Sequence, residues 1–147
     1  VTELSHNTVS IKWEAEALET LKEAAYFSLT FTPEHYSDAA IHNGIAYICG
    51  QMSLEPVTDL PIHGDIREET RRTLENLEAV LKAIGSTRDD VLSITCYMVN
   101  DEDFEGYDEV YGEFFGSNFP VRTTVNVKSL YDNLRLEINA IAIAHNE

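Results

Sequence analysis

The sequence predicts one α+β domain, in which two helices pack on one face of a β-sheet. Two segments have apolar residues every three or four positions, as amphipathic helices do, and strand-like segments precede, separate and follow them. The chain of 147 residues is 44% hydrophobic, and no Pro-, Gly- or Ser-rich linker divides it. Because each helix must bury its apolar stripe, we expect a single core and the order strand, strand, helix, strand, helix, strand, strand.

The beginning of the chain has a different pattern. Residues 13–27 (WEAEALETLKEAAYF) place small and apolar side chains on one side and charged side chains elsewhere, which predicts an amphipathic helix. We therefore assign residues 1–30 to an N-terminal extension and residues 31–147 to the domain itself.

Two short strands are predicted next. Residues 36–40 and 44–49 are strand-like, and the sequence His42-Asn43-Gly44 between them is typical of a hairpin turn. The second strand is expected to end at Gly50-Gln51.

The two helices have the clearest pattern in the chain. Their apolar faces consist of Leu74, Leu77, Val80, Leu81 and Ile84 in the first and Phe104, Tyr107, Val110, Tyr111 and Phe114 in the second. The expected end signals are Asp65 with Glu68 as a capping box and Gly85 for the first helix, and Asn100 or Asp101 with Gly116 for the second.

Three further strands complete the predicted sheet. Residues 91–99 alternate Leu92, Ile94, Cys96 and Met98 with Val91, Ser93, Thr95 and Tyr97, as a half-buried strand does. In the last two strands, within residues 119–127 and 134–142, we expect Val125, Val127, Leu136 and Ile138 to face the helices. The opposite face would then carry Arg122, Thr124, Asn126, Arg135, Glu137 and Asn139. Such a mixed polar face suggests contact with other subunits.

Arg122 and Glu137 are candidate functional residues on these last strands. A guanidinium can hold a carboxylate with two parallel hydrogen bonds, and a carboxylate can orient or deprotonate a water. Together they suggest hydrolysis of a small carboxylated molecule, with Arg122 expected to lower the pKa of Glu137. A structural ion pair or two solvated strand residues is the alternative interpretation.

The predicted geometry separates these two residues. A tight connection at residues 131–133 would pair Arg122 with a residue near Ile141 and place Glu137 opposite Asn126 or Val127. They would then lie about 15 Å apart along the sheet. We therefore expect Arg122 of one subunit to approach Glu137 of the next.

Composition excludes several partners. The formal net charge of −16 disfavours nucleic acid, and no apolar run is long enough to cross a membrane, so we expect a cytoplasmic protein. Cys49 and Cys96 lack CxxC spacing and are interpreted as core residues, and the histidines are too dispersed to predict a metal site.

Several motifs resemble those of the reactive-intermediate deaminase family (Rid, YjgF-type, also called L-PSP endoribonuclease-like). The similar stretches are HYSDAAIHNGIAYICGQ (35–51), TRRTLENLEAVLKAIGSTRDDVL (70–92), DFEGYDEVYGEFFG (103–116), FPVRTTV (119–125) and LEINAIAIA (136–144). They follow the family's order and spacing from Tyr36 to the C-terminus.

The resemblance implies a chorismate-mutase-like protomer, a homotrimer with three clefts between subunits, and no metal or organic cofactor. The implied activity is hydrolysis of 2-imino acids, such as the tautomer of 2-aminoacrylate, to 2-keto acids and ammonia. Arg122 matches the family's carboxylate-binding arginine and Glu137 the glutamate of the hydrolytic water. The other implied cleft residues are Tyr36, Gly50, Asp108 and Thr124.

Departures from the family pattern leave the substrate open. Asp108 stands where many relatives have asparagine, Cys49 replaces a serine, Asn139 replaces a frequent glutamate, and residues 130–134 lack the usual Leu-Pro-Lys or Leu-Pro-Arg. A noncatalytic carboxylate-binding regulatory trimer and a deaminase dedicated to one catabolic amino-dienoate therefore remain alternatives. Ribonuclease activity, suggested by the family label, is disfavoured by the acidic charge.

Overall fold

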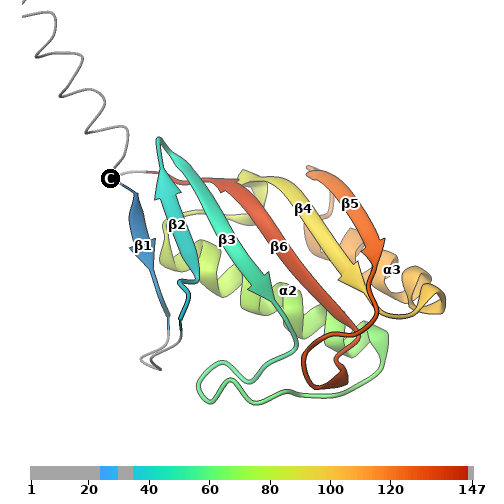
Figure 1. Ribbon diagram of the computed structural model, residues 1–147. Helices are drawn as coiled ribbons and strands as arrows, with labels where there is room; N and C mark the ends of the chain where they lie inside the picture. The colour runs from blue at the N-terminus through green and yellow to red at the C-terminus, as the bar shows by residue number, and fades with distance from the viewer. Residues whose placement is uncertain (1–23, 30–34, 146–147) are drawn as a thin grey trace, which may run out of the picture.

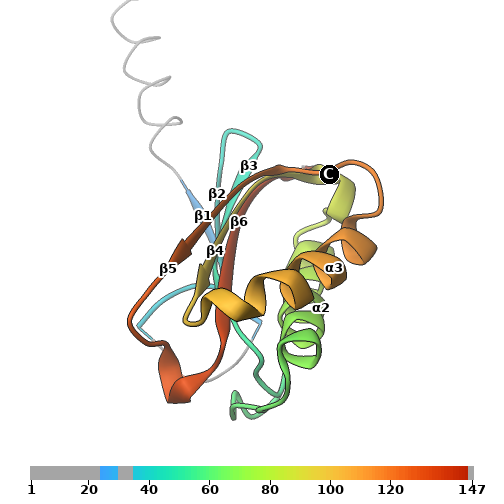
Figure 2. The ribbon, with the colours of Figure 1, turned by 90° about the vertical axis from the view of Figure 1, so that its right-hand side faces the viewer.

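A computed structural model of the chain describes residues 24–29 and 35–145. One six-stranded sheet has the order β1-β2-β3-β6-β4-β5 (Figure 1). Its strands are β1 Ala25–Phe27, β2 Ala39–His42, β3 Ile45–Gln51, β4 Val91–Met98, β5 Val121–Asn126 and β6 Leu136–Ile143. The helices α2 Ile66–Ala83 and α3 Phe104–Phe115 lie together on one face of the sheet (Figure 2). Short 3₁₀ turns occupy Arg88–Asp90, Asp101–Asp103 and Tyr131–Asn133. The predicted α+β class and the placement of both helices are confirmed.

The hydrophobic core lies between this helical layer and the sheet. The predicted apolar stripes of the two helices supply Leu74, Leu77, Leu81, Tyr107 and Tyr111, all of them buried. The facing side chains of β4 and β6 include Ile94, Cys96, Met98, Leu136 and Ile138, each no more than 1% exposed. Full burial of one such aliphatic side chain contributes about 1.5–3 kcal/mol, so this interface holds the layers together. Within the described residues, neither α-helix combines the length and the apolar character that crossing a bilayer requires.

The hairpin between β2 and β3 forms as predicted. Asn43 and Gly44 have φ values of 51° and 74°, the left-handed conformation that both central residues of such a tight turn adopt. The boundaries of the first strand shift, because β2 begins at Ala39 rather than Tyr36 and continues to His42, whereas β3 ends at Gln51 as predicted. Tyr36 therefore precedes the strand that was predicted to begin with it.

Helix capping is confirmed for α2 and corrected for α3. Asp65 accepts a hydrogen bond from the Glu68 backbone, and the Glu68 side chain accepts one from the Asp65 backbone in return. Neither Asn100 nor Asp101 caps α3, because the 3₁₀ turn Asp101–Asp103 leads directly into that helix. Gly116 ends α3 with a φ of 73°, as predicted.

The order of the last two strands differs from the prediction. They do not form a hairpin, because β5 pairs in parallel with β4, and β6 lies antiparallel between β3 and β4. The crossover through α3 returns the chain in the direction of β4, which makes β5 parallel to it. The turn at Tyr131–Asn133 then reverses the chain into the middle of the sheet. This strand order places β5 at an edge.

The predicted faces of β5 are wrong. Arg122 pairs with Ile94 and Thr124 with Cys96, so both point to the helical side of the sheet, and Val125 faces the open side. The prediction assumed a register against β6, whereas the register against β4 determines the face. Glu137 is opposite Tyr97 on the open side, as predicted.

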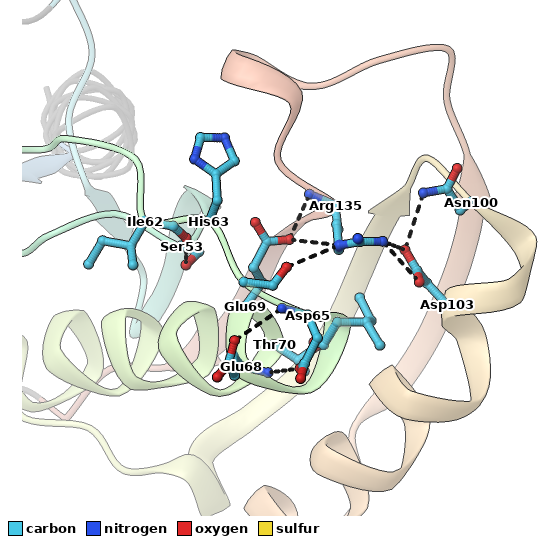
Figure 3. Close-up of polar contacts among 12 residues, drawn as sticks. Ser53, Ile62, His63, Asp65, Glu68, Glu69, Thr70, Asn100, Asp103 and Arg135 are labelled. Atoms are coloured by element: carbon cyan, nitrogen blue, oxygen red, sulfur yellow. Dashed lines mark hydrogen bonds and ion pairs between the residues drawn. The ribbon is translucent and has the colours of Figure 1, made fainter.

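Arg135 also departs from its predicted face. Its guanidinium bonds to Asp103 beside the start of α3, and its backbone N–H bonds to Glu69 of α2, so it joins the ends of the helical layer to the sheet (Figure 3).

Two local predictions near strand ends are also corrected. Ala25–Phe27 forms β1 at the edge of the sheet, where a helix over 13–27 was predicted. The remainder of that predicted helix, residues 13–23, lies outside the described residues. A register shift between Val91 and Ser93 buries Val91 and leaves Leu92 exposed, which reverses the predicted alternation there.

Candidate functional site

Arg122 is held by the aromatic face of α3. Its guanidinium carbon lies 4.6 Å from the centre of the Tyr111 ring, 5.4 Å from that of Tyr107 and 5.7 Å from that of Phe104. Asp108, on the same helix, accepts a hydrogen bond of 2.8 Å from Nη1 of Arg122. The side chain of Arg122 is only 25% exposed, so cation–π contacts and this ion pair fix its position on the edge strand.

The charge of Arg122 is maintained in this environment. Burial acts to lower its pKa, but the hydrogen bond to Asp108 and the neighbouring tyrosines outweigh that effect and raise the pKa. Arg122 therefore presents a permanent, oriented cation beside an acidic side chain.

Thr124 follows Arg122 on the same side of β5. The Tyr107 hydroxyl lies toward Thr124 and Cys96, although it makes no hydrogen bond of good geometry within the described part of the chain. Burial raises the pKa of Tyr107 and raises that of Cys96 to about 12, so neither group ionises near neutral pH. These side chains support the Arg122 position and supply no base.

Glu137 lies on the open side of the sheet, against the backbone of Gly50. A Cβ at position 50 would collide with the Glu137 carboxylate, so any larger residue there would require the Glu137 side chain to move. Among the described residues Glu137 makes no hydrogen bond or ion pair, and burial raises its pKa above the ordinary value of 4.5. The expectation that a nearby arginine lowers this pKa is wrong for the single protomer, because Arg122 lies on the other face.

A cavity of about 70 Å³ lies next to Gly50. Tyr36, Cys49, Gly50 and Gln51 are among its lining residues. Burial and the carboxylate of Asp38 raise the pKa of Cys49 to about 11, so its thiol stays protonated and is a weak nucleophile. Tyr36 is 57% exposed and extends beyond this cavity into a second, shallower one.

The six candidate residues thus form two groups. The carboxylate group, as we call it, consists of Tyr36, Gly50 and Glu137. Glu137 lies on the open face against Gly50, whereas Tyr36 shares with Gly50 the cavity described above, which also borders Asn76 and Ala79 of α2 and is not lined by Glu137. The guanidinium group consists of Asp108, Arg122 and Thr124 at the β5 edge, on the helical side. The two groups do not converge within one protomer, because they are separated by the sheet itself and not by distance along a hairpin.

Sequence reasoning missed the aromatic support of Arg122. Phe104, Tyr107 and Tyr111 were interpreted only as a core stripe, although their three- and four-residue spacing also places them on one helical face. Asp38 beside Cys49 was missed as well, and no local pattern in the sequence indicated it.

Comparisons with known proteins agree with this architecture. The family model described as endoribonuclease L-PSP matches residues 30–144. A RutC family protein of Pyrococcus horikoshii is 39% identical over 107 residues, which cover 73% of this chain and 85% of that protein. The human 2-iminobutanoate/2-iminopropanoate deaminase is 34% identical over 108 residues, covering 74% of this chain and 79% of the human protein. The crystal structure of Escherichia coli TdcF with bound serine has a TM-score of 0.72 and 28% identity, and covers 84% of this chain and 99% of that one. The chain therefore belongs to the Rid family, the YjgF-type or L-PSP endoribonuclease-like proteins, as its motifs predicted.

Proposed function

We propose that the protein is a deaminase that hydrolyses 2-imino acids to 2-keto acids and ammonia. The observation that carries the proposal is the pair of groups described above, one with a fixed guanidinium and the other with a half-buried carboxylate that lacks a partner among the described residues. The human relative is named for this reaction, and TdcF was solved with serine, a small carboxylated molecule.

Each residue type suits a step of that reaction. Arg122 binds the substrate carboxylate, and Glu137 positions a water against the imine carbon. A carboxylate whose pKa is raised by burial is a stronger base than an exposed one, so Glu137 accepts a proton from this water as it attacks. On a protonated imine the C–O bond forms, and Glu137 passes the proton it has taken to the nitrogen. The C–N bond then breaks while the hydroxyl proton moves to Glu137, which releases ammonia and leaves the keto group.

We propose that the two groups meet between subunits of a homotrimer. Within a protomer they lie on opposite sides of the sheet, so a shared site requires a second copy. Exposed apolar side chains on the open face support such contact: Val121 is 71% exposed, Tyr47 52% and Val125 40%. Closed symmetric assemblies are the common way to cover such a face.

RNA is a poor candidate substrate despite the family description. The formal net charge of −16 opposes binding of a phosphate backbone.

The direct test is hydrolysis of 2-aminoacrylate generated from serine by a dehydratase. The protein should accelerate loss of the imine, and Arg122→Ala should reduce kcat/KM at least about a hundredfold, because binding and orientation of the carboxylate are both lost. Arg67→Ala is the matched control, since Arg67 is an exposed arginine paired with Glu109 between the helices.

Wild-type rates should persist in Arg67→Ala. Carboxylate binding without acceleration by the wild-type protein would contradict the deaminase proposal and favour a noncatalytic regulatory trimer.

A further inference from the structure

The ion pair between Arg122 and Asp108 uses only part of each side chain. Nη1 of Arg122 donates to Oδ1 of Asp108 at 2.8 Å. Within residues 24–29 and 35–145, Arg122 donates no other hydrogen bond and Oδ2 of Asp108 accepts none. Nε and Nη2 of the guanidinium and Oδ2 of Asp108 therefore have no hydrogen-bond partner among these residues, and both side chains are partly exposed, at 25% and 50%.

The aromatic face of α3 keeps this arrangement in place. Three rings pack within 6 Å of the guanidinium carbon, the closest being Tyr111 at 4.6 Å, so Arg122 cannot swing freely away from Asp108. Asp108 is itself half exposed and lies one residue after Tyr107 on the same helix. A ligand that binds Arg122 will therefore also meet the Asp108 carboxylate.

Opposite charges side by side favour a particular class of ligand. A simple carboxylate is attracted by Arg122 and repelled by Asp108, whereas a zwitterion with a cationic nitrogen next to its carboxylate is attracted by both. We propose that Asp108 makes the site selective for zwitterionic 2-imino and 2-amino acids over anionic 2-keto acids, by accepting a hydrogen bond from the cationic nitrogen. The inference rests on the proposed function of Arg122 as the carboxylate anchor.

This selectivity has a consequence for turnover. A protonated 2-imino acid carries the cationic nitrogen, but hydrolysis removes that nitrogen as ammonia and leaves a keto oxygen from water. The product therefore faces Asp108 with a carboxylate and an acceptor oxygen, both of which the aspartate repels. Asp108 thus weakens product binding relative to substrate binding.

The test compares two ligands with one carbon skeleton, L-2-aminobutyrate and 2-oxobutanoate, by calorimetry near pH 7. Wild-type protein should bind the amino acid more tightly. Asp108→Asn should weaken binding of the amino acid and strengthen binding of the keto acid. The ratio of their dissociation constants should therefore change about five- to tenfold or more. Keto-acid inhibition of imine hydrolysis should strengthen in the same variant.

Glu109→Gln is the matched control, because it removes one negative charge from the next position of α3, where the side chain is paired with Arg67 and not with Arg122. The ratio of the two dissociation constants in this variant should equal that of the wild-type protein. An unchanged ratio in Asp108→Asn, with both ligands still bound, would overturn the inference alone. Binding of both ligands to Arg122→Ala at wild-type affinity, or to no form of the protein, would overturn the carboxylate anchor itself and the inference with it.

Discussion

Glu137 shows how a single residue's surroundings determine its chemistry. Burial raises its pKa, with no compensating hydrogen bond among the described residues, so its proton is lost at a higher pH than from an ordinary glutamate. In an assembled site, Arg122 of the next subunit would lower the pKa of Glu137. That cation is paired with Asp108 and would also bind the substrate carboxylate in the proposed site, so we expect burial to dominate the pKa of Glu137.

The resulting prediction concerns the pH profile of imine hydrolysis. The basic form of Glu137 predominates above its pKa, so kcat/KM should fall as the pH is lowered through a value above the ordinary glutamate pKa of 4.5. This fall is the acid limb of the pH profile, and it is measured from rates between pH 4 and 9 that are corrected for spontaneous loss of the imine. Glu137→Asp should retain an acid limb at a reduced rate, whereas Glu137→Gln should lose it. A limb at or below the ordinary glutamate value would contradict burial as the main influence.

The grouping of the site residues could not be predicted at this scale. All six candidates can be named from motifs, because each motif is a short local sequence. Whether Arg122 shares a face with Glu137 depends on the pairing of Arg122 with Ile94, a residue from a distant segment. A change of register by one residue reverses a strand's faces, so local alternation was insufficient.

At the scale of elements, Arg135 links the ends of the two helices to the sheet. Its guanidinium contacts both carboxylate oxygens of Asp103, at 3.1 and 3.3 Å, and the carbonyl of Gly64, while its backbone N–H donates to Glu69 (Figure 3). The side chains of Glu69 and Asp103 are only 1% and 10% exposed. Burial raises the pKa of Glu69, and the backbone N–H and the charge of Arg135 partly offset this. Arg135 is therefore the cation that compensates two poorly solvated acids.

Removal of this cation should destabilise the fold. Arg135→Ala leaves both acids without their cation, and the free energy of unfolding should fall by about 2–4 kcal/mol. This loss is smaller than that expected for a fully buried ion pair, because the side chain of Arg135 is 40% exposed. Arg67→Ala breaks an exposed pair and should cost about 0–1 kcal/mol. Urea unfolding at one protomer concentration measures both. Equal losses in the two variants would contradict this role.

Which elements could be predicted follows from the range of the interactions that form them. The Asn43-Gly44 turn, the capping box of α2 and the two apolar helical stripes depend on residues close together in the sequence. The position of β5 depends on where the crossover through α3 returns, and the strand β1 depends on pairing with β2. Neither pairing has a signal within its own segment.

For the whole molecule, the sheet has one covered and one open face. The guanidinium group lies at the β5 edge on the covered side, and Glu137 of the carboxylate group lies on the open face. A protomer therefore holds both halves of the proposed site but cannot bring its own halves together. In a closed ring each protomer would give its guanidinium group to one neighbour and its carboxylate group to the other.

That arrangement predicts complementation between two inactive variants. When Arg122→Ala and Glu137→Gln chains are unfolded and refolded together in equal amounts, a site is intact if its arginine comes from one kind of chain and its glutamate from the other. Each condition holds for half of the sites, so about one quarter of the sites should be active. Imine hydrolysis should recover to about that fraction of the wild-type rate, while either variant refolded alone keeps only its low residual rate. Native mass spectrometry of differently tagged chains verifies that mixed trimers have formed. Mixed trimers without recovered activity would mean that Arg122 and Glu137 act within one chain or not together, because only a site shared between chains can be rebuilt by mixing.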